Sequence, residues 1–218
     1  MSLRAVIFDF DYTLADSSKG IIDCIQTAQA GMELPISDPE AIRHTIGLAV
    51  PEILATLNGE EQRSRTDEFA RRFRDRADEV MADQTFIYSG VRQTLESLKA
   101  ADVYSAIAST KFRYRIEEIL ERDGLRSLVN TVIGAEDVAQ HKPDPACLHA
   151  VLEKLGISAD EALYVGDSPP DGEAAQRAGI DFVAVLTGTT PASGFDSFCP
   201  VVVLDDVSAL PRWLTRND

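Results

Sequence analysis

The chain has 218 residues, of which 44% are hydrophobic and 26% charged, a balance typical of a folded globular protein rather than a disordered or fibrous one. Its length exceeds the roughly 150 residues of a typical domain but falls short of two, so we expect one core domain with an insertion. The formal net charge of -15 argues against nucleic acid or an anionic membrane as a partner, because both require a positive protein surface.

The cysteines Cys24, Cys147 and Cys199 are far apart and include no C-x-x-C pair, so neither a disulfide framework nor a zinc site is indicated. No stretch reaches 18 apolar residues, and the first residues lack the apolar span of a signal peptide. We therefore expect a cytoplasmic protein with reduced thiols. The sequence leaves open whether it is a monomer or a homodimer.

In chain order, the first predicted element is an apolar strand at residues 3–8. The stretch 17–83 then shows no convincing strand but several helical patterns in a row. The last of these, at 60–83, carries Phe69, Phe73, Ala77 and Val80 on one face. We predict a helical domain at 17–83, inserted into a core domain made of 1–16 and 84–218.

Strands and helices alternate in the remainder of the chain. Short apolar runs predict strands at 103–108, 131–133, 162–165, 182–186 and 201–204. Between most of them, apolar residues recur at helical spacing, and Asp144 and Pro145 are expected to cap and begin a helix that ends at Gly156. This alternation predicts an α/β fold with a doubly wound parallel sheet.

Two carboxylates, Asp9 and Asp11, follow the first predicted strand directly. Ligands of open parallel sheets bind beyond the carboxyl ends of the strands, so both side chains would project into that crevice. Aspartates also cap helices and form turns, and this pair alone is therefore not specific.

Three later strand ends carry further polar groups. Ser109 and Thr110 offer hydroxyls to a phosphate oxygen, Lys142 lies in a proline-stiffened loop, and Asp167 and Asp171 follow the strand at 162–165. A helix cap or a solvated lysine would explain any one of these groups, but hardly all of them together.

The combined set of four carboxylates, two hydroxyls and one lysine at the same sheet edge points to a metal site. Clustered carboxylates cannot all stay ionised without a cation, and oxygen ligands favour a hard ion such as Mg²⁺. The sequence therefore predicts a magnesium site that receives a small anion.

The four motifs occur in the order D-x-D-x-T at 9–13, Ser/Thr at 109–110, lysine at 142 and G-D-x-x-x-D at 166–171. In this order they resemble the haloacid dehalogenase superfamily of phosphatases. The segment 166–179 is especially similar to phosphoglycolate phosphatase-like members, in which a helical cap is inserted after the first motif.

This resemblance implies that Asp9 is a nucleophile that becomes transiently phosphorylated and that Asp11 is the general acid/base. Lys142 would be the partner of the nucleophile and of the phosphate. Ser109 would bind the phosphate, with Thr110 as the second candidate for that hydroxyl.

For the metal, the resemblance implies Asp9, the backbone carbonyl of Asp11, and Asp167 as ligands, with Asp171 supporting the site. Tyr12 stands where glycine is frequent in the family and is expected to narrow the entrance. Gly47, in the segment 45–51, resembles part of a substrate-specificity loop, although a plain turn between helices would also need this glycine.

The expected function is Mg²⁺-dependent hydrolysis of a small phosphorylated metabolite, with phosphoglycolate as the first candidate. Asp11 argues against a dehalogenase, because halide departure needs no proton. The alternatives are an inorganic pyrophosphatase or a sugar-phosphate phosphatase or mutase; in the mutase, a histidine occupies the place of Ile21. A non-catalytic phosphate-binding protein would not require Asp11.

Overall fold

The computed structural model describes residues 3–217, which divide into two compact units. One unit contains the residues up to Ala15 together with those from Ile87 onward, and the other is Asp16–Phe86. The short strands β2 (Ala15–Asp16) and β3 (Phe86–Ile87) pair where the chain passes between the units. The sequence did not predict these strands, because two residues carry no periodic pattern.

Within the described residues, the first unit holds one six-stranded parallel sheet with the order β5-β4-β1-β6-β7-β8. Its strands are β1 (Ala5–Phe8), β4 (Tyr104–Ala108), β5 (Thr131–Ile133), β6 (Ala162–Gly166), β7 (Asp181–Val185) and β8 (Val202–Leu204). Each lies within two residues of a predicted strand. The predicted α/β fold with a parallel sheet is confirmed.

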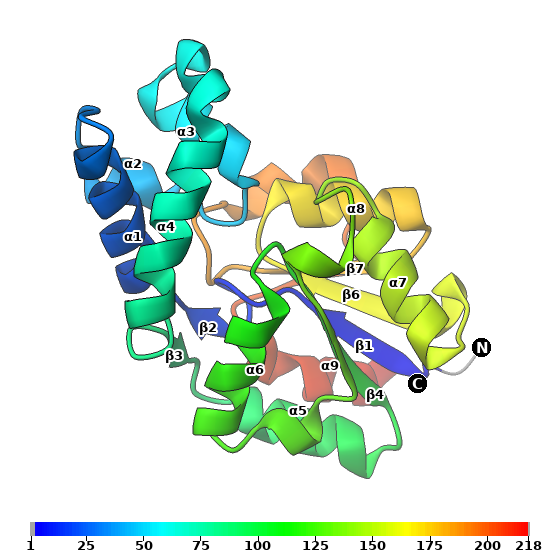
Figure 1. The fold of residues 1–218 in the computed structure, drawn as a ribbon. Helices are drawn as coiled ribbons and strands as arrows, with labels where there is room; N and C mark the ends of the chain where they lie inside the picture. Colours follow the sequence, from blue (N-terminus) through cyan, green and yellow to red (C-terminus); the bar gives the residue numbers. More distant parts are fainter. Residues whose placement is uncertain (1–2, 218) are drawn as a thin grey trace. The chain divides into compact units, whose positions relative to one another are not determined.

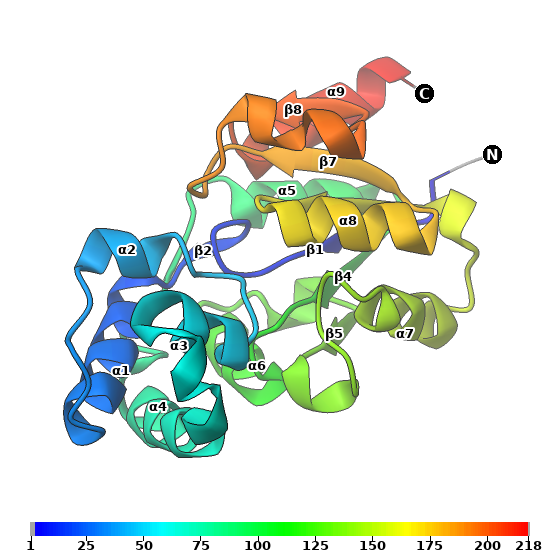
Figure 2. The ribbon, with the colours of Figure 1, turned by 90° about the horizontal axis from the view of Figure 1, so that it is seen from above.

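Helices cover both faces of this sheet, with α7 and α8 on one face and α5 and α9 on the other (Figures 1 and 2). The helices are α5 (Val91–Ala100), α6 (Arg113–Arg122), α7 (Ala146–Leu155), α8 (Pro169–Ala178) and α9 (Leu210–Asn217). Short 3-10 turns lie at Arg126–Leu128, Ala135–Asp137, Ala159–Glu161, Ala192–Phe198 and Val207–Ala209. Coverage of both faces explains why the strands are continuously apolar in sequence.

The core beneath α7 and α8 is built from alternate strand residues. The cluster includes Ile7, Ala106, Ala108, Tyr164, Phe182, Leu148, Val151, Ala174 and Ala175. The centres of the Tyr164 and Phe182 rings lie 6.3 Å apart with a tilt of 38°, and the Tyr164 side chain is fully buried. This packing holds the phenol hydroxyl of Tyr164 within hydrogen-bonding distance of Asp171.

The start of α7 differs by one residue from the prediction. The helix begins at Ala146, Pro145 takes the cap position, and Asp144 Oδ1 accepts a hydrogen bond from the Ala146 N–H at 3.0 Å. Asp144 therefore caps the helix from the residue before the N-cap position, because Pro145 occupies the N-cap position itself. The helix ends at Leu155, and Gly156, the predicted stop, follows it with a left-handed φ of 64°.

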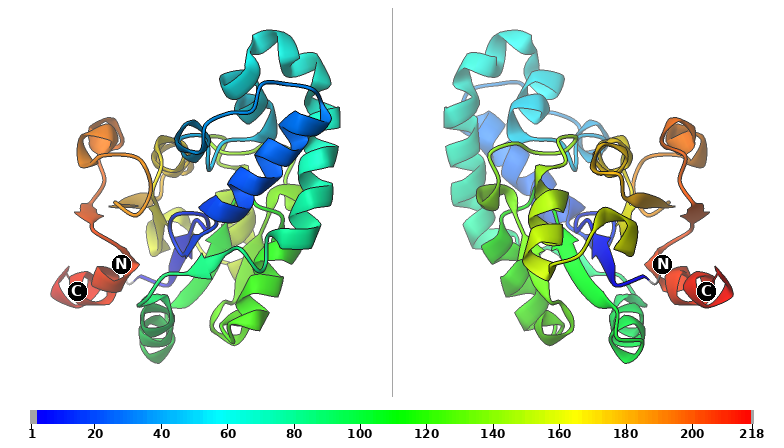
Figure 3. Two further views of the ribbon diagram at one scale, coloured as in Figure 1. Left: turned by 90° about the vertical axis from the view of Figure 1, so that its left-hand side faces the viewer. Right: turned by 90° about the vertical axis from the view of Figure 1, so that its right-hand side faces the viewer.

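The second unit is helical. It contains α1 (Ser18–Gly31), α2 (Pro39–Arg43), α3 (Val50–Asn58), a 3-10 helix (Glu60–Arg65) and α4 (Thr66–Val80). Figure 3 shows α1 and α4 side by side, and an ion pair of 2.8 Å joins Arg76 to Asp23 between them. The segment 60–83, predicted as one helical pattern, contains a 3-10 helix up to Arg65 and an α-helix that begins at Thr66. The α-helix buries Phe69 and Ala77.

No helix in residues 3–217 combines the length and the apolar character needed to cross a bilayer. All three cysteines are free; Cys24 and Cys147 are buried, whereas Cys199 is exposed. Scattered cysteines without pairs are what the sequence predicted.

Candidate active site

The sheet order places a topological switch point at the carboxyl end of β1. Strand β1 lies between β4 and β6, and its residue Phe8 is in register with Ile107 of β4 and with Val165 of β6. From β4 the chain continues to β5 on one side of β1, and from β6 it continues to β7 on the other side. This reversal of direction is a topological switch point, the place where α/β proteins bind ligands. Asp9 leaves β1 at this point.

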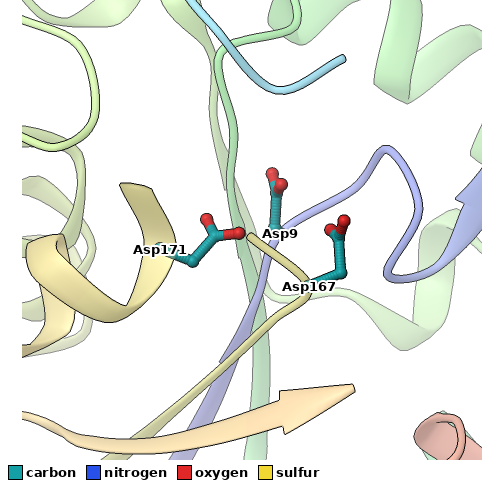
Figure 4. A group of neighbouring side chains, drawn as sticks. All are labelled: Asp9, Asp167 and Asp171. Atoms are coloured by element: carbon teal, nitrogen blue, oxygen red, sulfur yellow. The ribbon is translucent and has the colours of Figure 1, made fainter. Parts of the chain in front are cut away.

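Three carboxylates meet there. Asp9 follows β1, Asp167 follows β6, and Asp171 lies in the first turn of α8. One carboxylate oxygen from each lies within 4.8 Å of the others, and the side chains converge in Figure 4. All three residues are buried, with exposed fractions of 2%, 4% and 0%.

Lys142 joins two of these carboxylates. Its Nζ lies 2.9 Å from Asp9 Oδ1 and 2.6 Å from Asp171 Oδ1. Burial alone would lower the pKa of Lys142, but the negative charges of Asp171 and Asp9 outweigh it and raise that pKa. Lys142 is therefore an ammonium group held against Asp9.

The carboxylate of Asp171 has both oxygens in use. Oδ1 accepts from Lys142 and from the Tyr164 hydroxyl at 2.8 Å, and Oδ2 accepts from the Ser168 N–H at 3.1 Å and the Ser168 Oγ at 2.5 Å. A Cβ on Gly166 would lie 2.5 Å from the Asp171 Cβ, so this close approach requires glycine. Asp171 holds Lys142 and the loop that carries Asp167.

Asp167 is oriented by two residues from other loops. Thr13 donates a hydrogen bond from Oγ1 to Asp167 Oδ1 at 3.0 Å. Gly188, in the loop after β7, lies so close to Asp167 Oδ2 that an added Cβ would overlap that oxygen. The Asp167 carboxylate therefore lies between the hydroxyl of Thr13 and the backbone of Gly188.

Asp11 has a different partner. Lys111 Nζ lies 2.9 Å from Asp11 Oδ1, and both side chains are largely buried. Ser109 is buried as well, whereas Thr110 is partly exposed. The structure thus places Asp9, Asp11, Ser109, Lys142, Asp167 and Asp171 at the same edge of one sheet.

The carboxylates have raised pKa values. Burial raises the pKa of Asp9 to about 6, with Lys142 opposing the shift and Asp171 adding to it. Burial also raises the pKa of Asp167 well above its ordinary value, and Asp171 and Asp9 add to the effect. Both shifts have the same cause: burial and the neighbouring carboxylates disfavour negative charge on these groups.

The donor set fits a hard divalent cation. The ligand atoms available are carboxylate oxygens, which are the ligands that Mg²⁺ prefers. Asp9 Oδ1 is buried and receives no well-aligned hydrogen bond within the described chain, although Lys142 Nζ lies 2.9 Å away. An ion at this position would satisfy that oxygen.

Two further predicted residues, Gly47 and Tyr12, have positive φ angles. Gly47 lies in the helical unit, in the turn between α2 and α3, with a φ of 94°; its role in substrate binding stays a prediction. Tyr12 has a φ of 61° and is 6% exposed. This left-handed backbone explains the preference for glycine at the position, because a side chain there costs about 1–2 kcal/mol.

Sequence reasoning missed the supporting residues Thr13, Lys111, Tyr164 and Gly188. Thr13 belongs to the first motif and Lys111 follows Ser109 by two residues, so both positions were visible but carried no assigned role. Tyr164 and Gly188 had no sequence signal, because only the packing of the sheet places them beside the carboxylates.

Comparison with known proteins agrees with this geometry. Residues 6–185 match the family model described as haloacid dehalogenase-like hydrolase. The chain belongs to this family. The match spans all the motifs from Asp9 to Asp171.

Several relatives are similar over most of their length. The chain is 32% identical over 212 residues to a phosphoglycolate phosphatase of Pseudomonas savastanoi pv. phaseolicola, a match covering 95% of this chain and 78% of the relative. It is 31% identical to a phosphoglycolate phosphatase of Rhodospirillum rubrum, with 97% and 90% covered. A crystal structure from Bacteroides fragilis, described as a haloacid dehalogenase-like hydrolase, matches with a TM-score of 0.92, 32% identity, and 96% and 100% coverage.

The confinement of Asp167 predicts that Gly188→Ala weakens cation binding. The added Cβ would displace Asp167 Oδ2, and changes in groups that orient a metal ligand typically cost about 10–100-fold in affinity. Calorimetric titration of the protein with Mg²⁺ measures this loss directly. Thr189→Ala, an exposed change in the same loop, is the control. Equal Mg²⁺ affinity in Gly188→Ala and the native protein would show that Gly188 does not constrain Asp167.

Proposed function

We propose that this chain is a Mg²⁺-dependent phosphatase that hydrolyses a small phosphomonoester through a phosphorylated Asp9. The observation that carries the proposal is the buried group of three carboxylates in which Lys142 contacts both Asp9 and Asp171. Such an arrangement suits a negatively charged substrate, because an ammonium and a cation then face it together. The relatives named phosphoglycolate phosphatase support the same reaction class.

In the first proposed step, a carboxylate oxygen of Asp9 attacks phosphorus and forms a new P–O bond. The ester P–O bond breaks, and Asp11 donates a proton to the departing alkoxide oxygen. Ser109 and Lys142 hold the phosphoryl oxygens during the transfer. Lys142 can do so because it is an ammonium group beside Asp9.

In the second step, water attacks the aspartyl phosphate, the bond between phosphorus and Asp9 breaks, and inorganic phosphate leaves. Asp11 accepts the proton from the attacking water and so returns to its starting state. Each proton transfer contributes roughly 10²–10⁴ in rate. The covalent route divides one slow hydrolysis into two faster displacements.

The residues proposed to hold Mg²⁺ are Asp9, Asp167 and the backbone carbonyl of Asp11. Asp171 supports them, because its two oxygens already accept hydrogen bonds from three residues. Bound Mg²⁺ would supply electrostatic stabilisation of the phosphoryl oxygens and would offset the charge of the carboxylates.

Phosphoglycolate is the first candidate substrate, as the names of the relatives suggest. Pyrophosphate and sugar phosphates are the alternatives within the family. We propose that residues 17–83 form a cap domain that favours small substrates, with Gly47 in its specificity loop. A cytoplasmic location and a monomeric or homodimeric state remain predictions.

The nucleophile assignment predicts that Asp9→Asn abolishes phosphate release. An amide cannot attack phosphorus, so turnover should fall by at least ~10³-fold. The assay measures Mg²⁺-dependent phosphate release from p-nitrophenyl phosphate, phosphoglycolate and pyrophosphate, which also ranks the candidate substrates. Asp160→Asn, an exposed carboxylate on the surface, is the matched control.

Two outcomes would count against the proposal. If Asp9→Asn kept its activity while Asp160→Asn behaved normally, Asp9 would not be the nucleophile. If the native protein were inert toward the whole panel, the non-catalytic phosphate-binding alternative would take its place.

The raised carboxyl pKa values predict that Mg²⁺ stabilises the protein in a pH-dependent way. A raised folded-state pKa favours the protonated form, so the stabilising contribution of Asp9 is complete below its ordinary 3.8 and is lost as the pH rises through about 6. Mg²⁺ competes with protons for these oxygens. Its stabilising effect should therefore be small at about pH 5 and large at about pH 7.5, reaching ~2.7 kcal/mol at a hundredfold excess over Kd.

Thermal unfolding with and without Mg²⁺ at both pH values measures this effect. Asp167→Asn should remove most of the Mg²⁺-dependent shift at the higher pH, because it removes a ligand. A shift of the same size at both pH values would contradict cation binding by these carboxylates.

A further inference from the structure

Lys111 is a second buried lysine at the carboxyl end of the sheet, and it has no role in the two reaction steps proposed above. It is 7% exposed, and its Nζ lies 2.9 Å from Asp11 Oδ1 and 5.7 Å from the centre of the Phe10 ring. Lysines are almost never this buried unless they are paired, because removing an ammonium group from water is costly. The ion pair with Asp11 therefore compensates the burial of the Lys111 ammonium group.

The backbone of Lys111 is anchored on both sides. Its N–H donates to Ser109 Oγ at 3.3 Å, and its carbonyl accepts from the Ala135 N–H at 3.0 Å. The loop after β4 therefore holds the Cα of Lys111 in place. Because this Cα is held in place, the ammonium group of Lys111 contacts Asp11 from a fixed point in the loop.

The ion pair engages one oxygen of Asp11 and leaves the other available. Lys111 contacts Oδ1 at 2.9 Å, and Oδ2 takes no part in this ion pair. A carboxylate held by one oxygen keeps its plane fixed while the second oxygen carries or accepts a proton. This is the geometry that a general acid/base needs, since misplacement by about 1 Å can cost 10²-fold in rate.

We propose that Lys111 is a positioning residue that orients Asp11 for proton transfer to the leaving oxygen. The proposal rests on the phosphatase function proposed above and assigns to Lys111 a role distinct from that of Lys142. Lys142 contacts Asp9 and Asp171, whereas Lys111 contacts Asp11. Each of the two buried lysines thus acts on a different catalytic aspartate.

The role predicts a dependence on the leaving group. p-Nitrophenolate departs readily as an anion, whereas phenolate is more basic and gains more from a proton donated as the ester bond breaks. Loss of Asp11 orientation should therefore harm phenyl phosphate more than p-nitrophenyl phosphate. A merely structural defect would reduce activity on both esters alike.

The experiment compares kcat/KM for these two esters in the native protein, Lys111→Met and Lys111→Gln. We expect the Lys111 variants to lose at least about tenfold more activity on phenyl phosphate than on p-nitrophenyl phosphate. Lys154→Met, which removes an exposed lysine, should leave the ratio of the two esters unchanged. Lys111→Gln keeps a polar side chain and provides the comparison if Lys111→Met does not fold.

A double variant tests whether Lys111 acts through Asp11. In an Asp11→Asn background, Lys111→Met should change the ester ratio by less than about twofold, because the group it orients is gone. Equal losses on both esters with an active native protein would overturn the positioning role alone. An ester ratio that still changes in the Asp11→Asn background would also overturn it. A native protein inert on both esters would instead refute the phosphatase function.

Discussion

The crowding of buried carboxylates around Asp9 is the constraint on which the rest of the structure depends. Three buried aspartates bring oxygens within 4.8 Å of one another. At such separations their mutual repulsion and desolvation disfavour ionisation, as the raised pKa values of Asp9 and Asp167 express. One lysine offsets only part of this charge, which is why we propose that a cation binds here.

The surrounding residues keep this unfavourable cluster in a defined geometry. Asp171 is held by Tyr164 and Ser168, and in turn holds Lys142 against Asp9. Thr13 and Gly188 confine Asp167 from another side. Because these groups come from different strands and the loops that follow them, the parallel sheet determines how they lie relative to one another.

Much of this could be predicted from the sequence, since apolar runs mark strands buried on both faces and the polar residues that follow them must lie at one edge. Asp9, Lys142 and Asp167 were located in this way. Lys111 was not assigned a role, because a lysine in a sequence is indistinguishable from a solvated one until the burial of its loop is known. Gly188 shows a similar limit: its closeness to Asp167 is a tertiary contact between loops of neighbouring strands. The left-handed backbone of Tyr12 was also hidden, because tyrosine does not signal that conformation.

Asp9 is proposed to carry the phosphoryl group during turnover, and trapping that group is the most direct test. Enzyme mixed with excess phosphomonoester and Mg²⁺ is quenched in acid within the first turnovers, digested, and analysed by peptide mass spectrometry. We expect one added phosphoryl group on the peptide that contains Asp9, and borohydride reduction of the acyl phosphate should mark Asp9 itself. A phosphoryl group on any other residue, or turnover with no labelled peptide at all, would contradict it.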